Sequence, residues 1–209
     1  MIRIGGKNMD VSSMQNSFED GEINREVLKD VIQRKTEKCV NILLKDSKYS
    51  DEEVDVIALA QRLGFKIANV LFKGDSLEGF IIIDKKKDKI MGIKTNMLIG
   101  VDTRLSVQKK RFLIAHELGH YFLHYRGKNY FAHRESKKGK DRHENAADYF
   151  AAALLMPQEA FITQYNYFMT LFDNNINNVI ISLARWFCVE EDCILRRIKE
   201  VFPKDGGAR

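Results

Sequence analysis

A helical pattern is predicted between about residues 24 and 64 of this chain, after a stretch without periodicity. Residues 1–22 mix Gly, Ser, Asn and isolated charges without periodicity, and we interpret them as a mobile tail. From residue 24 to about 45 apolar positions recur every three or four residues, which predicts a helix. A second helix is expected to begin at Ser50, because Ser50 and Glu53 have the spacing of a capping box, and to end at Gly64.

The pattern then changes from helical to strand-like. Residues 65–72, 77–84 and 89–95 are short segments rich in β-branched and aromatic residues, and turn-forming residues separate them. Such segments predict β-strands. We therefore expect a small antiparallel sheet in the middle of the chain.

After the predicted sheet the sequence is mainly helical. Ser106 can cap a helix that runs to about Tyr125, a polar loop follows over residues 126–142, and another helix covers residues 144–156. Pro157 ends that helix and can begin the next one. The expected fold class is therefore α+β, mostly helical, with the sheet placed before the Ser106 helix.

Composition places the chain among globular proteins. It has 209 residues, of which 44% are apolar and 30% charged, enough for one buried core and unlike a disordered or fibrous chain. No run approaches the about 18 apolar residues of a membrane span, and the first residues lack a signal-peptide pattern, so we expect a cytoplasmic protein. The three cysteines, Cys39, Cys188 and Cys193, lack C-x-x-C spacing and are expected to be reduced thiols.

The chain carries a small excess of positive charge. It has 34 basic and 29 acidic residues, a net charge of +5. Much of the excess lies in two runs, at residues 85–94 and 134–143. We interpret both runs as solvated turns, with a weak nucleic-acid surface as the alternative.

A candidate metal site lies within the Ser106 helix, in the sequence His116-Glu117-Leu118-Gly119-His120. A step of four residues turns an α-helix by about 40° net and rises about 6 Å, so the two imidazoles share one face and can bind one ion. Paired histidines with a third protein ligand are typical of catalytic zinc. Glu117 lies beside the ion, where its carboxylate can take a proton from a zinc-bound water.

Three residues compete for the third ligand position. His124 lies about 12 Å along the helix axis from His116, too far for one tetrahedral centre, and we interpret it as structural. The residues after His120 also lack the metzincin pattern. His143 and Glu144 remain, and we favour Glu144 because Asp148, four residues on, can then accept a hydrogen bond from a ligand imidazole.

Together these motifs resemble the ImmA/IrrE metallo-endopeptidases. The resemblance rests on residues 111–120, on Leu123-His124 and on the second motif at residues 144–157, and extends from about Asp51 to Val201. It implies a zincin-like protease core.

The resemblance also implies residue roles and a function. It implies that His116, His120 and Glu144 bind one zinc ion per chain and that Glu117 is the catalytic base. It implies an endopeptidase that cleaves a helix-turn-helix (XRE-type) repressor and so releases stress or mobile-element genes. The alternatives are a non-proteolytic regulator or toxin–antitoxin component that binds a repressor or DNA, and a metal-dependent toxin with a non-peptide substrate.

Two features of the expected site stay open. An additional donor to the oxyanion is expected, and the candidates are His143, His133, Tyr149 and Tyr165. Zinc is the geometric default, but manganese or iron also suit two histidines and a carboxylate.

The C-terminal segment resembles a helix-turn-helix, as members of this family often show after the protease core. It departs from that pattern at Cys188, where the turn usually has Gly, and at Glu190, Glu191 and Asp192, which would face DNA phosphates unfavourably. We therefore expect a packing or substrate-docking pair of helices rather than a DNA reader. Trp186 and Phe187 are expected in the core.

The predicted organisation has four parts. They are an N-terminal tail (1–22), a metallopeptidase domain (23–172), a helix-turn-helix-like segment (173–203) and a C-terminal tail (204–209).

Overall fold

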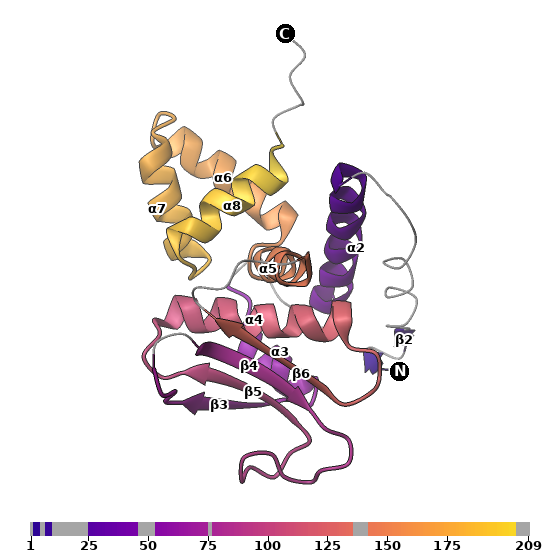
Figure 1. Ribbon diagram of the computed structural model, residues 1–209. Helices are drawn as coiled ribbons and strands as arrows, with labels where there is room; N and C mark the ends of the chain where they lie inside the picture. Colours follow the sequence, from indigo (N-terminus) through magenta and orange to yellow (C-terminus); the bar gives the residue numbers. More distant parts are fainter. Residues whose placement is uncertain are drawn as a thin grey trace.

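The computed structural model describes residues 2–4, 7–9, 25–45, 53–74, 77–135 and 142–203 (Figure 1). The elements follow one another as β1 (Ile2–Ile4), β2 (Lys7–Met9), α2 (Arg25–Lys45), α3 (Val56–Arg62), β3 (Lys66–Val70), β4 (Leu77–Ile83), β5 (Met97–Asp102), α4 (Val107–His124), β6 (Tyr130–Glu135), α5 (Arg142–Leu155), α6 (Gln158–Leu171), α7 (Ile176–Trp186) and α8 (Glu191–Val201). The expected α+β class is confirmed.

The main sheet has the strand order β3-β5-β4-β6. Strand β4 pairs antiparallel with β5 and β6, whereas β3 runs parallel to β5, so the sheet is mixed. The predicted strand at 89–95 is wrong: Met91 and Gly92 adopt left-handed φ angles of 50° and 80°, and only a single bridge joins Ile90 to Ile93. The strand lies instead at β5. The predicted polar loop at 126–142 contains the edge strand β6.

The sequence predicted side-chain caps at the starts of two helices, and the structure confirms one of them. Ser106 caps α4 by accepting a hydrogen bond from the backbone N–H of Lys109. The predicted helix start at Ser50 is wrong, because α3 begins at Val56 and Asp55 is its cap. Ser50 itself lies outside the described residues.

Helix α4 lies between the sheet and helix α5, and α2 packs beside α5 (Figure 1). The approach of α4 to α5 is close because small residues face each other. A Cβ atom added at Gly119 would lie 3.0 Å from the Cα of Ala147. Two alanines of α5, Ala151 and Ala152, are fully buried.

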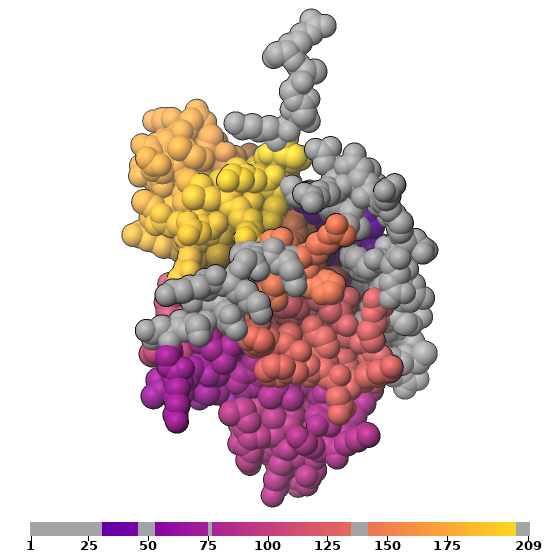
Figure 2. Space-filling model, in the orientation of Figure 1, coloured from indigo at the N-terminus to yellow at the C-terminus, as the bar shows by residue number. Residues whose placement is uncertain are grey.

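Helices α6, α7 and α8 form a lobe above α4 and α5, drawn in gold and yellow in Figure 2. The turn between α7 and α8 is at Cys188, which has a left-handed φ of 51°. Phe187 is 1% exposed, as expected for a core residue, but Trp186 is 42% exposed, so the prediction of a core position for Trp186 is wrong.

The remaining expectations concern charge, thiols and the chain ends. The lysines from Lys85 to Lys94 are exposed, as expected for solvated turns. The cysteines are free, and burial raises the pKa of Cys39 to about 12. No helix among the described residues is long and apolar enough to cross a membrane. Within the predicted N-terminal tail β1 and β2 pair antiparallel; most of that segment, and residues 204–209, lie outside the described residues.

Candidate metal centre

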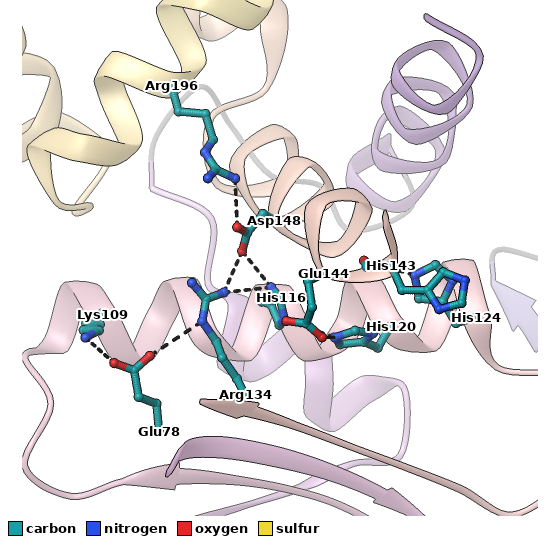
Figure 3. Close-up of polar contacts among 10 residues, drawn as sticks. All are labelled: Glu78, Lys109, His116, His120, His124, Arg134, His143, Glu144, Asp148 and Arg196. Carbon is teal, nitrogen blue, oxygen red and sulfur yellow. Dashed lines mark hydrogen bonds and ion pairs between the residues drawn. The ribbon is translucent and has the colours of Figure 1, made fainter. Parts of the chain in front are cut away.

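Three ligand-type side chains converge between α4 and α5. The Nε2 atoms of His116 and His120 lie 3.0 Å apart. One carboxylate oxygen of Glu144 lies 3.3 Å from the first nitrogen, and the other lies 3.1 Å from the second (Figure 3). The structure therefore brings together the residues of both sequence motifs.

The spacing of these atoms suits one small cation. In a tetrahedral zinc site with bonds of about 2.0–2.1 Å, neighbouring ligand atoms lie about 3.3 Å apart. The three observed separations are close to that value. His116 is fully buried and His120 is 3% exposed, so their lone pairs are directed into a protected site.

Asp148 fixes the orientation of His116. Its Oδ1 atom lies 2.9 Å from the Nδ1 atom of His116, on the far side of the ring from Glu144. If Nδ1 carries the proton and donates to Asp148, Nε2 presents its lone pair to the ligand cluster. This is the geometry expected from the four-residue spacing of Glu144 and Asp148.

Two arginines hold the Asp148 carboxylate. Arg134 on β6 places Nη1 2.6 Å from Oδ1, and Arg196 on α8 places Nη1 3.0 Å from Oδ2. Arg134 Nη1 is also 2.9 Å from Nδ1 of His116, but a guanidinium only donates, so its hydrogen bond goes to the carboxylate. Arg134 belongs to the basic run at 134–143, and here it lies in the site rather than in a solvated turn.

The ligands also shift one another's pKa values. Burial lowers the pKa of His120. Burial acts the same way on His116, but hydrogen bonds to Asp148 and Glu144 outweigh it and raise the pKa. Burial raises the pKa of Glu144, and hydrogen bonds to both histidines outweigh it, so the pKa of Glu144 lies well below its usual range. The cluster thus stabilises an ionised carboxylate facing two imidazoles.

Glu117 is fully buried beside this cluster. Burial raises its pKa to about 8, against the opposing effect of His116. Neither carboxylate oxygen has a hydrogen-bond partner among the described residues. Burying such a group without a partner costs several kcal/mol, by an order-of-magnitude estimate. A cation and a water at the ligand cluster would supply the partner, so the residues present fit a bound metal ion.

Two other histidines, His124 and His143, lie next to each other near one end of the site. The ring centroid of His143 lies 4.4 Å from that of His124. His124 in turn lies 5.5 Å from His120 and outside the ligand set. This position agrees with the prediction that His124 is a structural residue and not a ligand.

Three predicted oxyanion donors have their contacts elsewhere. His133 stacks on Phe131 at 5.6 Å, and strand alternation places it on the opposite face of β6 from Arg134. The hydroxyl of Tyr149 donates to Glu37 on α2. Tyr165 packs against aromatic rings of the C-terminal lobe. The structure therefore does not bring these three to the ligand cluster.

Sequence reasoning missed three residues of the site. They are Arg134, Arg196 and Tyr130, whose hydroxyl lies 3.5 Å from Nδ1 of His120. Tyr130 and Arg134 lie on β6, which the sequence pattern did not reveal. Arg196 comes from α8, and no local spacing connects it to the motifs.

A cavity of about 240 Å³ adjoins the site on the side of Asp148. Its walls come from the start of α4, from β4 and β6, and from the start of α8. The charged residues that line it are Glu78, Lys109, Arg134, Asp148, Glu190, Asp192 and Arg196.

The sequence profile of the M78 peptidases, described as the IrrE N-terminal-like domain, matches residues 78–199, more than half of the chain. The chain belongs to this family. The match runs from β4 almost to the end of α8, so it includes every residue of the ligand cluster and both arginines that hold Asp148. The family identified from the two motifs is thereby confirmed.

Two curated relatives of this M78-family chain match shorter stretches. The metallopeptidase ImmA of Bacillus subtilis (strain 168) is 45% identical over 51 residues, which are 24% of this chain and 30% of the relative. An uncharacterized immunity region protein 2 of Bacillus phage phi105 is 34% identical over 95 residues, which are 43% of this chain and 60% of the relative. The chain therefore spans less than two thirds of the length of either relative.

Proposed function

We propose that this chain is a zinc-dependent endopeptidase in which His116, His120 and Glu144 hold the ion and Glu117 is the catalytic base. The observation that carries the proposal is the convergence of three lone-pair donors beside a buried carboxylate that lacks a hydrogen-bond partner among the described residues. Membership of a peptidase family supports the same reaction class. A merely structural zinc site would leave Glu117 without a role.

The chemistry follows from the positions of the side chains. Zinc, when bound, supplies a Lewis acid that polarises the peptide carbonyl and makes water more acidic. Glu117 takes a proton from the attacking water as the water oxygen bonds to the carbonyl carbon, and then passes that proton to the nitrogen as the C–N bond breaks. Asp148 keeps His116 in the tautomer that presents Nε2. Of the four predicted oxyanion donors, His143 directly precedes the ligand Glu144 in the sequence.

The substrate we propose is a helix-turn-helix repressor. The resemblance to ImmA/IrrE endopeptidases implies it, and the name of the phage relative, an immunity region protein, supports a repressor-related role. The charged cavity on the Asp148 side of His116 can receive a polar side chain of such a substrate.

The test is intact-mass analysis of a helix-turn-helix repressor from the same replicon after co-expression with this chain. Wild type should yield a new pair of fragments. Glu117→Gln should lower the cleavage rate by about 10²- to 10⁴-fold while keeping zinc, because it removes only the base. Glu144→Ala should lose both zinc and cleavage.

The outcomes separate the hypotheses. Cleavage retained by Glu117→Gln would exclude Glu117 as the base, and unchanged zinc content in Glu144→Ala would move the third ligand elsewhere. A stable complex without fragments, for wild type and variants alike, would instead support a non-proteolytic regulator.

A further inference from the structure

Helix α8 contributes a side chain to the metal centre from outside the two motif helices. Asp148 is fully buried, and its Oδ1 atom is engaged by His116 and Arg134. Its second oxygen, Oδ2, lies 3.0 Å from Nη1 of Arg196 (Figure 3). The carboxylate that orients a metal ligand is therefore also held by the C-terminal lobe.

The residue after Arg196 anchors α8 in place. Arg197 is fully buried; its Nε atom donates to the backbone oxygen of Met156, just after α5, and its Nη2 atom lies 2.8 Å from Glu37 of α2. Ile194, on the same face, is also fully buried. With this anchor the position of α8 along α5 is set, and Arg196 is directed toward Asp148.

The metal-binding helix itself holds the other end of α8. Ser106, the cap of α4, donates its hydroxyl to Glu190 at a distance of 3.2 Å. Arg111, also on the α4 side, donates from Nε to the backbone oxygen of Cys188 at 3.2 Å, in the turn before α8. The start of α4 thus contacts Cys188 and Glu190. These are two of the positions at which the helix-turn-helix-like segment (173–203) departs from a DNA-reading pattern.

We propose that Arg196 is a positioning residue of the metal centre, and that α8 is a part of this centre rather than of a separate module. This inference rests on the zinc site proposed above. A carboxylate held at both oxygens cannot rotate, so the imidazole that donates to it keeps the direction needed for Nε2 to face the ion. Loss of Arg196 removes this ion pair at Oδ2 and lets His116 tilt.

The test measures metal affinity and coordination in the full-length protein, without any substrate. Zinc and cobalt titrations are compared for wild type, Arg196→Met and Arg196→Lys, with Lys199→Met as the control on an exposed position of the same helix. Partners that orient metal ligands typically contribute about 10- to 100-fold in affinity. We expect Arg196→Met to weaken zinc binding by about 10-fold and to change the visible cobalt spectrum, Arg196→Lys to recover part of the loss, and Lys199→Met to match wild type.

A double-variant cycle separates positioning from general damage. In an Asp148→Asn background the further change Arg196→Met should have little effect on zinc affinity, because its partner carboxylate is already gone. An equal loss in that background would overturn the inference, as would wild-type affinity and an unchanged cobalt spectrum in Arg196→Met alone. If wild type itself binds no metal, the proposed zinc peptidase fails first.

Discussion

Helix α5 carries two buried polar clusters on different faces, and their compositions differ in an instructive way. Facing α4, Glu144 meets two histidine nitrogens, and all of these atoms offer lone pairs. Facing α2 and α8, Tyr149 meets the cluster around Arg197, where the chain itself supplies the positive charge. A buried cluster with its own cation is complete as a structural tie, whereas converging lone pairs need a cation from solution.

The Arg197 cluster shows what such a tie contains. Its guanidinium lies 2.8 Å from Glu37 and 3.6 Å from Glu200, and its centre is 6.0 Å from the ring centroid of Tyr149. Burial raises the pKa of Glu200 to about 7. Arg197 thus compensates the negative charge of Glu37 well and that of Glu200 poorly.

The largest effect on folding is expected from removing that cation. Arg197→Met leaves the largely buried carboxylates of Glu37 and Glu200 without this cation, and breaking a buried pair in this way costs about 3–5 kcal/mol. Urea denaturation should show this loss in the free energy of unfolding. Arg185→Met, an exposed position on α7, is the matched control and should change it by less than about 0.5 kcal/mol. Equal effects would mean that the cluster is not a structural tie.

A smaller effect is expected where α4 approaches α5. Gly119→Ala adds a methyl group 3.0 Å from the backbone of Ala147, and backbone cannot rotate away. Overpacking of this kind costs about 1–3 kcal/mol, which exceeds the gain of up to about 1 kcal/mol from helix propensity. The temperature of thermal unfolding and the affinity for zinc should both fall. Val107 is exposed at the start of the same helix, and Val107→Ala should leave both quantities unchanged. If Gly119→Ala were more stable than wild type, the two helices could separate without cost.

The smallest effect concerns pH and the poorly compensated carboxyl group. The pKa of Glu200 rises from an ordinary 4.5 to about 7, so its contribution to stability is full below pH 4.5 and is lost as pH rises through 7. Glu200→Gln cannot ionise. Relative to wild type, it should gain about 1 kcal/mol in unfolding free energy between pH 5 and pH 6. A difference between variant and wild type that is independent of pH would contradict the raised pKa.

Predictability differed between the two clusters for a physical reason. His116 and His120 lie four residues apart on one helix, and Glu144 and Asp148 four residues apart on another, so the helical period alone places each pair on one face. The two pairs come together once α4 and α5 pack against each other. The Arg197 cluster joins α2, α5 and α8, and nothing in the spacing of its residues along the chain shows that they meet.

The errors along the chain have the same origin. The strand predicted at 89–95 had suitable residue types, but the left-handed turn at Met91 and Gly92 moved the pairing segment to β5. The second half of β6 is polar and charged residues flank the strand, so its pattern did not differ from that of a loop. In both cases contacts with a partner strand outweighed local preference.

The sequence by itself determined the α+β class, the helix that carries His116 and His120, and the residues able to hold a metal ion, since each depends on spacing within a single element. Only the tertiary structure decided that β6 and α8 complete the site through Arg134 and Arg196. These contacts join residues 14 and 48 positions from Asp148. Over such separations the path of the chain between elements, rather than any local period, sets which side chains meet.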